Sequence, residues 1–324
     1  MADGKKIIKP AKNASLQRTL FQLCSFRFRS IAAKKEARAA YLFLIPAFIG
    51  LIFLTYGPLL AVFGISFTSW RAGDRTISFT GFTNFINLFT VDPFFKDAIK
   101  VTAYFTLLAV AASLIYSLAV AMLLNRKIPA RGFFRVIFYI PYVLPAVAVY
   151  MGWYLLYDTN FGFFNYILTL LNIDKVHFIQ DSALVVPSLA LIAVWLSGNL
   201  IVIFLAGLQN VPRVYYEAAE IDGANYWQRF CNVTIPGMTP IIFYNLLMAI
   251  VTNMQVVTPA LALTSGGPGN STRFMTYLMY VEAFQRGRLG SASAISFIFF
   301  IIVAVFTAVI FVTSREWVFY EGDK

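Results

Sequence analysis

Six long runs without a charged side chain constrain this sequence more than any other feature. They cover residues 41–66, 101–124, 136–157, 183–208, 240–262 and 293–314. A helix needs about 20 predominantly apolar residues to cross a hydrocarbon core, and every run is long enough. Strands of a membrane barrel would instead show short segments that alternate apolar and polar residues. The runs therefore predict an all-α membrane protein with six transmembrane helices.

The distribution of basic residues predicts the orientation of these helices. Lys and Arg are retained on the cytoplasmic side of membrane proteins, and an even number of spans places both termini on one side. If that side is the cytoplasm, the inner segments hold 18 basic and 8 acidic residues, whereas the outer loops hold 8 and 7. We therefore expect both termini in the cytoplasm.

Three regions follow from this topology. We expect residues 1–40 to form a cytoplasmic basic tail, and residues 41–314 to form the six-helix transmembrane domain, with a cytoplasmic loop at 209–239. Residues 315–324 would form a second cytoplasmic tail. The stretch "SLQRTLFQLCSFRFRSIAAKK" in the first tail mixes apolar and basic residues, which is typical of a helix in the membrane interface; a merely solvated tail fits the pattern equally well.

Charge and cysteine usage exclude several classes of protein. The net charge is +11, but the basic residues cluster beside the apolar runs and not on a soluble domain, so no nucleic-acid partner is expected. Cys24 and Cys231 both fall on the predicted cytoplasmic side. They should be reduced there, and the sequence predicts no disulfide framework.

The sequence contains none of the motifs that would make the chain an enzyme. It has no G-x-x-x-x-G-K-[ST] phosphate-binding loop, no HExxH and no CxxC, and its single histidine, His177, cannot complete a catalytic triad. We expect no catalytic residue, no metal site and no cofactor bound by this chain. If ATP drives it, a separate ATPase chain must bind the ATP and Mg²⁺.

The segment "EAAEIDGANYWQRFCNVTIPGMTP", from Glu217 to Pro240, is unusually polar for this chain. Good helix formers follow Pro212, and Gly223 is suited to ending that helix. Asn225 is a candidate cap for a second short helix, which Pro236 and Pro240 would end before the fifth span. The loop is net negative and tethered to the membrane, so a DNA-binding helix-turn-helix is excluded.

This segment resembles the signature loop of permease subunits of binding-protein-dependent ABC importers. The pattern E-A-A-x-x-D-G-A, then an aromatic residue and P-x-x-x-P, is matched at nine positions: Glu217, Ala218, Ala219, Asp222, Gly223, Ala224, Phe230, Pro236 and Pro240. Stretches such as "AYLFLIPAFIGLIFLTYGPLL" and "LTSGGPGNSTRFMTYLMYVEAF" are similar to the carbohydrate-uptake branch, and most closely to the first permease of heteromeric pairs of the maltose, glycerol-phosphate and alginate type.

The resemblance implies a type I permease fold in a bacterial inner membrane, with a coupling helix that docks on the ATPase. It further implies a second homologous permease, two ATPase subunits and an extracytoplasmic solute-binding protein as partners. Two alanines allow close approach of a partner, and Glu217 and Asp222 can accept charge-assisted hydrogen bonds. Tyr226, Trp227 and Phe230 would supply aromatic anchors. The blander interpretation is that Asp222 and Gly223 only form a turn and that the aromatic residues lie among lipid headgroups.

Candidates for a substrate path must be uncharged, because the six runs contain no ionisable acid or base. They are Trp195, Asn199, Tyr244, Asn245, Asn253 and Gln255. Amides bond hydroxyl groups and aromatic faces stack on sugar rings, so this set suits a saccharide. Hydrogen bonding between helices is an equally good explanation for each amide. If the substrate is acidic, the only basic residues of this chain that could bind it are Arg273, Arg286 and Arg288, near the outer face.

The sequence therefore predicts the transmembrane subunit of an ATP-driven importer that moves a sugar or oligosaccharide by alternating access, with an alginate oligosaccharide as one candidate substrate. The first alternative is an ion-coupled secondary transporter or channel without an ATPase, although the intramembrane carboxylates that ion coupling normally uses are absent. The second alternative is a membrane scaffold whose cytoplasmic loop recruits partners.

Overall fold

A computed structural model of the chain describes residues 31–319, in two units that divide at Ala61 and Val62. The described part of the first unit is helical: α2 (Ile31–Gly50), the π-helix η1 (Leu51–Tyr56) and the beginning of α3 (Gly57–Ile65). Residues 35–65 are long and apolar enough to span a membrane. The expected interfacial helix before residue 31 and Cys24 lie outside the described residues, and residues 31–40 belong to α2.

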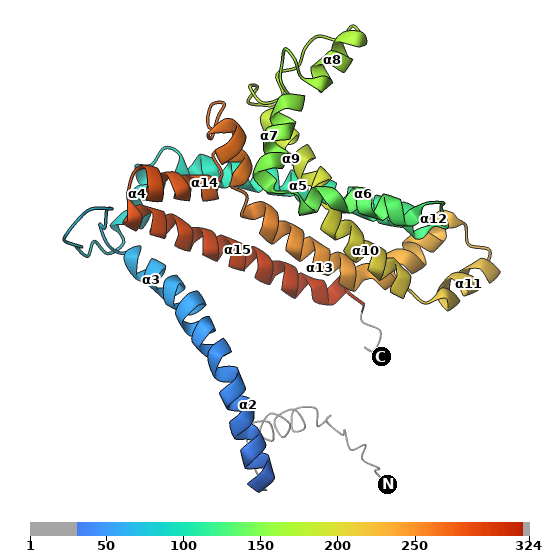
Figure 1. Ribbon diagram of the computed structural model, residues 1–324, viewed down its shortest axis with the longest axis horizontal. Coiled ribbons are helices and arrows are strands. Elements are labelled where there is room, and N and C mark those ends of the chain that lie inside the picture. Colours follow the sequence, from blue (N-terminus) through green and yellow to red (C-terminus); the bar gives the residue numbers. More distant parts are fainter. Residues whose placement is uncertain (1–30, 320–324) are drawn as a thin grey trace, which may run out of the picture. The chain divides into compact units, whose positions relative to one another are not determined.

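The second unit is built from helices throughout its described part (Figure 1). Only an isolated bridge, between Thr68 and Phe79, has β character among the described residues. The helices are α4 (Thr83–Thr90), α5 (Phe95–Asn125), α6 (Arg131–Val143), α7 (Ala146–Leu156), α8 (Phe163–Leu170), α9 (Val185–Trp195), α10 (Gly198–Asn210), α11 (Arg213–Ile221), α12 (Tyr226–Arg229), η2 (Phe230–Thr234), α13 (Ile235–Met254), η3 (Ala260–Thr264), α14 (Met275–Tyr280), η4 (Val281–Gln285) and α15 (Leu289–Trp317).

Helix α5 is the central helix of this unit and contacts α9, α10, α13 and α14. Its buried face carries small residues at every fourth position: Ala109, Ser113, Ser117 and Ala121. Residues four apart lie on one face of a helix, and small side chains there let neighbouring helices approach closely. The sequence of this one helix therefore explains how four others pack around it.

Three contacts show that different parts of the chain meet α5 at different points along its length. The Met275 backbone N–H of α14 donates to the Thr102 hydroxyl at 2.9 Å. Further along, the hydroxyls of Ser117 and Ser197 are 2.9 Å apart. Just beyond the end of α5, the Arg126 guanidinium lies 5.6 Å from the centre of the Tyr226 ring. One helix thus touches three separate parts of the chain.

The expected spans three and four each consist of two helices. The structure has four helices that are long and apolar enough to span a membrane, or up to six spans if each bent pair counts as one. Helices α6 and α7 meet at 100°, and α9 and α10 meet at 50°. Pro145 caps α7 at the first break, whereas the second break falls at Leu196 and Ser197 and involves no proline.

The elements of the second unit have a clear polarity (Figure 1). Helices α4 and α14 lie at one end of the long helices α5, α13 and α15, and α11 and α12 lie at the opposite end. The last helix also ends near the start of α13, because the Phe319 N–H donates to the Thr239 hydroxyl at 3.0 Å. The polar signature segment and the expected outer loops around α4 and α14 are therefore at opposite ends.

Candidate functional site

The signature segment folds as two short helices joined by a tight turn. Helix α11 ends in a Schellman arrangement, in which the Ala224 N–H bonds to the Ala219 carbonyl at 2.9 Å and the Gly223 N–H bonds to the Glu220 carbonyl at 3.1 Å. Gly223 has φ = +75°, a left-handed conformation that glycine adopts without strain. The sequence prediction of a helix that ends at Gly223 is confirmed.

The second helix begins with the predicted cap. The Asn225 side chain accepts from the Gln228 N–H at 2.9 Å, and the Gln228 side chain accepts from the Asn225 N–H at 2.7 Å. This reciprocal pair is a capping box, which satisfies two backbone donors that a helix start otherwise leaves unpaired. The turn between the helices is therefore fixed from both sides.

The prediction that Pro236 and Pro240 end the second helix is wrong. Helix α12 continues through the π-helical turn η2 into α13, and Pro240 lies inside α13. The carbonyl of Pro236 has no N–H to accept from residue 240, since proline lacks one. The Thr239 hydroxyl donates to that carbonyl instead, at 2.8 Å, so the helix tolerates the proline.

The three acids of the segment are all exposed, and they differ in their partners. Glu220 forms an ion pair with Arg229 across the turn. Within the described residues, Glu217 and Asp222 have no ion-pair partner, and both side chains are exposed. The Glu220 pair was not predicted, because nine residues separate it from Arg229 and only the turn brings the two together. Glu217 and Asp222 are the acids left available to a partner.

An exposed apolar surface surrounds these acids. Ile221 is 87% exposed and Trp227 is 69% exposed, and Val214, Tyr215 and Tyr226 are at least half exposed. Several exposed apolar side chains on one short segment are typical of contact sites for proteins or membranes. The sequence predicted Tyr226 and Trp227 as exposed anchors, but not Val214, Tyr215 and Ile221. The spacing of Val214, Ala218 and Ile221 by four and three residues is that of one helix face, and it could have indicated them. Ala218 is exposed on the same helix, and Ala219 is half-buried.

Phe230 faces inward and not toward a partner. It is half-buried, packs edge-on against Trp227 with ring centres 5.7 Å apart, and lines a cavity of about 250 Å³ with Tyr216 and Arg126. The Tyr216 hydroxyl is 3.0 Å from the Thr234 hydroxyl. Phe230 therefore joins the signature segment to the ends of α5 and α13, instead of serving as an exposed anchor.

The predicted substrate-path residues do not form one cluster. Trp195, at the end of α9, is partly exposed and stacks edge-on against Trp153, with ring centres 5.7 Å apart. Asn199 is half-buried at the start of α10, Tyr244 is exposed on α13, and Gln255 is exposed just after α13 ends. Asn253 is half-buried and donates to the Ala249 carbonyl at 2.8 Å within its own helix.

Asn245 is the clearest departure from the expected path. Its side chain is 0% exposed and donates to the Leu200 carbonyl of α10 at 3.3 Å. Its amide oxygen accepts no hydrogen bond from the described residues. In this conformation Asn245 joins two helices, as the alternative interpretation of the amides proposed, and a substrate cannot reach it.

An apolar cavity lined by α7 and by Trp195 of α9 was not predicted from the sequence. The cavity has a volume of about 510 Å³ and is lined by Trp153, Trp195, Leu144, Gly152 and Leu156, among others. Trp153 lies within an expected span and carried no signal of its own. Its ring lies beside that of Trp195, a residue of the next expected span, with ring centres 5.7 Å apart.

Comparisons with known proteins identify the family of this chain and confirm its fold. The sequence profile of a family described as "Binding-protein-dependent transport system inner membrane component" matches residues 113–315. The chain belongs to this family. The resemblance seen in the sequence is thereby confirmed, and the chain is a multi-pass inner-membrane permease subunit of an ABC importer, without catalytic activity of its own.

Curated relatives cover nearly the whole chain. The probable ABC transporter permease protein YesP of Bacillus subtilis (strain 168) is 35% identical over 91% of this chain and 96% of its own length. The trehalose/maltose transport system permease protein MalF of Thermococcus litoralis is 29% identical, over 87% of this chain and 95% of its own. The multiple sugar-binding transport system permease protein MsmF of Streptococcus mutans serotype c is 32% identical, over 85% and 94%.

A solved structure confirms the fold. A chain of a bacterial alginate ABC transporter, crystallised with an alginate pentasaccharide-bound periplasmic protein, superposes with a TM-score of 0.77 and covers 87% of this chain and 96% of its own length. At 22% identity, this likeness establishes the importer permease fold and nothing about the substrate. Family membership also favours an importer that depends on a binding protein over the secondary transporter and the scaffold.

Proposed function

We propose that this chain imports a sugar or oligosaccharide, together with a second homologous permease and two ATPase subunits, by alternating access. An extracytoplasmic solute-binding protein delivers the substrate. The chain binds no ATP or Mg²⁺ itself, since it lacks a phosphate-binding loop; both belong to the ATPase subunits. Alginate oligosaccharide stays one candidate substrate among others.

The exposed surface of α11, α12 and the turn between them is the observation that carries the proposal. Ile221, Trp227 and Tyr226 offer aromatic and aliphatic groups to a partner, and Glu217 and Asp222 supply acceptors beside them. A mixed surface of this kind, with an aromatic centre, is typical of protein interfaces. The partner that fits is an ATPase with an apolar groove and basic groups at its edge.

The inward contacts of the same segment explain how a docked ATPase would act on the membrane domain. Helix α12 continues into α13 without a break, and Tyr226 lies against Arg126 at the end of α5. A displacement of the turn is therefore passed to two membrane helices. Glu217, Ala218, Ala219, Asp222, Gly223 and Ala224 form or border the docking surface, whereas Phe230 and Pro236 belong to the connection with α13.

The substrate class rests on the relatives and on the uncharged interior. Trehalose, maltose and multiple sugars appear in the names of related permeases. Trp153 and Trp195 border a cavity large enough for a sugar-sized ligand, and aromatic faces pack well on pyranose rings. We propose Trp195 and Trp153 as the most promising contacts for substrate, followed by Asn199, Tyr244, Asn253 and Gln255.

Coupling is tested by hydrolysis assays on the reconstituted complex. Glu217→Ala and Gly223→Pro should leave the chain inserted but abolish most of the stimulation of ATP hydrolysis by substrate-loaded binding protein. Glu316→Ala removes an exposed acid outside the signature segment and serves as the matched control. Normal stimulation in the Gly223→Pro complex would disprove the role of this turn.

Orientation is tested by labelling single cysteines in intact cells. In a Cys24→Ser, Cys231→Ser background, Ala218→Cys should resist a membrane-impermeant maleimide until the cells are opened. Asp174→Cys, in the exposed segment after α8, should react at once. Rapid labelling of Ala218→Cys from outside would overturn the predicted topology and, with it, docking of a cytoplasmic ATPase.

A further inference from the structure

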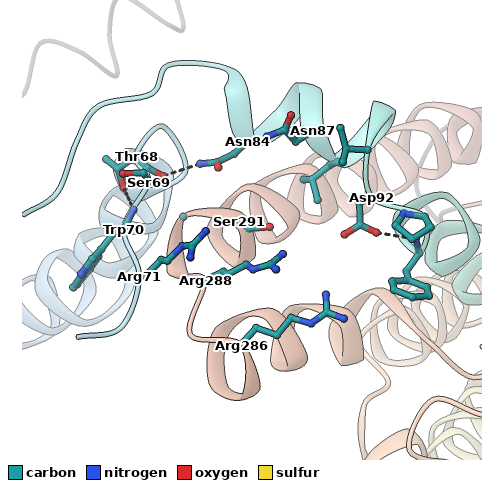
Figure 2. Close-up of a pocket in the computed structure, with 15 residues that line it drawn as sticks. Thr68, Ser69, Trp70, Arg71, Asn84, Asn87, Asp92, Arg286, Arg288 and Ser291 are labelled. Carbon is teal, nitrogen blue, oxygen red and sulfur yellow. Dashed lines mark hydrogen bonds between the residues drawn. The ribbon is translucent and has the colours of Figure 1, made fainter. Parts of the chain in front are cut away.

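A pocket of about 410 Å³ lies at the end of the second unit opposite to the signature segment. Its walls are the segment around Trp70, helix α4 with the residues that follow it, and the junction of η4 with α15 (Figure 2). The coupling surface does not contribute to it. Because the signature segment is expected in the cytoplasm, this pocket is expected on the extracytoplasmic side.

Three arginines converge on this pocket, although they come from separate segments. Arg71 precedes α4 in sequence, and Arg286 and Arg288 lie between η4 and α15; Figure 2 shows their guanidinium groups directed toward the same space. Arg286 and Arg288 both pair with Glu282, with Arg288 Nη1 3.7 Å from Glu282 Oε2. Within the described residues Arg71 has no ion-pair partner.

Glu282 holds two of these arginines in place from behind the pocket. Its side chain is 0% exposed, and its Oε2 atom accepts no hydrogen bond from the described residues. Burying an unpaired carboxylate is costly, so the two guanidinium groups are required where they are. Their outward faces are left for a ligand, since each guanidinium carries five N–H donors.

The Asp92 carboxylate, on the pocket wall, is already hydrogen-bonded to backbone N–H groups. Asp92 Oδ1 accepts from the Phe94 N–H at 2.7 Å and from the Phe95 N–H at 3.0 Å, which caps the start of α5. With Glu282 included, three arginines face two carboxylates. The pocket therefore keeps an excess positive charge, centred on Arg71.

The pocket is built before any ligand arrives. The Asn84 amide donates to the carbonyls of Ser66 and Thr68, both at 2.8 Å. The Gly290 N–H donates to the Trp70 carbonyl at 3.0 Å, and a Cβ at Gly290 would lie only 2.1 Å from the Thr68 oxygen. The segment that carries Trp70 and Arg71 is thus fastened to the start of α15.

The other residues that line the pocket fit an acidic sugar better than they fit the side chain of a single Asp or Glu from another protein. Asn87 offers an amide that makes no side-chain hydrogen bond with the described residues, and Ser291 offers a hydroxyl. The Trp70 ring is directed away from the three arginines (Figure 2). Amides and hydroxyls bond the hydroxyls of a saccharide, and guanidinium forks match a carboxylate with two parallel hydrogen bonds. The pocket volume falls in the range of small-molecule sites. It is larger than the volume that a single carboxylate group needs.

We propose that this pocket binds the carboxylate of an acidic saccharide at the extracytoplasmic end of the permease. Arg71 and Arg288 hold the carboxylate, Arg286 adds charge, and Asn87 with Ser291 contacts the hydroxyl groups of the sugar. The proposal rests on the proposed function, because it narrows the imported sugars to a class that includes uronates. It also supplies the basic groups that the uncharged spans lack.

Calorimetric titration of the purified full-length chain in nanodiscs tests this directly. The probes are the methyl glycosides of glucuronate, galacturonate and mannuronate, each compared with the neutral hexoside that carries CH₂OH in place of the carboxylate. At least one uronide should bind, and its neutral partner should bind at least ten-fold more weakly. If no uronide binds, or if the neutral hexosides bind equally well, the proposal is wrong.

Variants assign the binding to the pocket. Arg71→Gln should weaken uronide binding at least ten-fold, and Arg71→Lys should weaken it less, because lysine keeps the charge but not the fork. Within the described residues, the Arg71 side chain forms no ion pair, so Arg71→Gln breaks none. Arg75→Gln removes the same charge four residues away and outside the pocket; an equal loss in this control would show a diffuse charge effect and overturn the site.

The experiments distinguish a failure of the pocket proposal from a failure of the proposed function. If neutral sugars stimulate ATP hydrolysis in the assembled complex and the uronides do not bind the chain, the importer proposal stands and the pocket proposal fails. If uronides bind but no sugar stimulates hydrolysis, the reverse holds. If Arg71→Gln weakens only the docking of a binding protein, the carboxylate belongs to that protein and the saccharide proposal is wrong.

Discussion

Gly198 offers the sharpest test of the packing in this structure. It is the first residue of α10, directly after the bend with α9, and it is buried against α6. A Cβ added there would lie 2.6 Å from the Phe138 carbonyl oxygen and 3.1 Å from the Tyr139 Cα. Both atoms belong to the backbone, so no side chain can rotate out of the way.

The cost of Gly198→Ala follows from that distance. Non-bonded heavy atoms are most stable at about 3.5–4.0 Å, so the Phe138 carbonyl and the new Cβ must separate by about 1 Å, and the other contacts of α6 with α10 then open. Overpacking of this kind typically costs about 1–3 kcal/mol. We therefore expect the free energy of unfolding to fall by that amount, although alanine is the better helix former.

The measurement is an SDS titration of the full chain in mixed micelles, followed by circular dichroism. Gly207→Ala is the graded control, because its Cβ would meet only the Ile241 side chain, at 2.9 Å, which can move. Gly152→Ala meets nothing within 4 Å and should be neutral or slightly stabilising. If Gly198→Ala unfolds at the same SDS fraction as Gly152→Ala, the close approach of α6 and α10 is refuted.

Three further outcomes follow from local geometry. Gly223→Ala should destabilise the signature turn by about 1–2 kcal/mol through its left-handed backbone alone, because no atom lies near its Cβ; faster hydrogen exchange at the Ala224 amide would report it, and unchanged exchange would contradict it. Gly290→Ala should abolish uronide binding and lower the unfolding midpoint, since its Cβ would collide with the Thr68 carbonyl; wild-type binding would show that the pocket wall is misplaced. The N–H groups of Phe161 and Asn160 lower the pKa of Asp158, so the carboxylate stabilises this turn at neutral pH and loses that effect as the pH falls through the lowered pKa. Amide exchange at residues 160 and 161, corrected for its intrinsic pH dependence, should therefore gain an acid-induced increase that Asp158→Asn does not show.

The membrane character, the helical fold and the family were predictable from the sequence, because each depends on signals that are local in the chain. Charge-free runs report on the lipid environment residue by residue. The turn at Gly223 and the cap at Asn225 are likewise local, since each is decided within about four residues. These features are the ones that the structure and the comparisons bear out.

The bends of spans three and four were not predictable in the same way. Pro187 and Pro145 look alike in sequence, yet only Pro145 lies at a break. Pro187 falls in the first turn of α9, where the missing N–H has no partner to lose. The break before α10 depends instead on Ser197, whose hydroxyl bonds to the Val194 carbonyl at 2.6 Å and faces Ser117, 80 residues away.

The candidate sites show the same limit. Asn245 and Asn253 have the same chemistry, and only the neighbouring helices decide that the first is buried against Leu200. The outer pocket brings Arg71 beside Arg288, from opposite ends of the second unit's sequence. Such pairs depend on tertiary packing. Their residues are far apart in the chain and share no motif, so a single sequence cannot reveal them.

The length of α5 has a mechanical consequence. Its 31 residues span about 46 Å at 1.5 Å per residue, and its contacts reach from Met275 of α14 to Tyr226 of α12. A rigid rod of that length acts as a lever: a tilt of about 5° about its midpoint moves the two ends in opposite directions by about 2 Å each. A side-chain-sized shift at Tyr226 is then sufficient to separate or close groups at the opposite surface, without any helix having to bend.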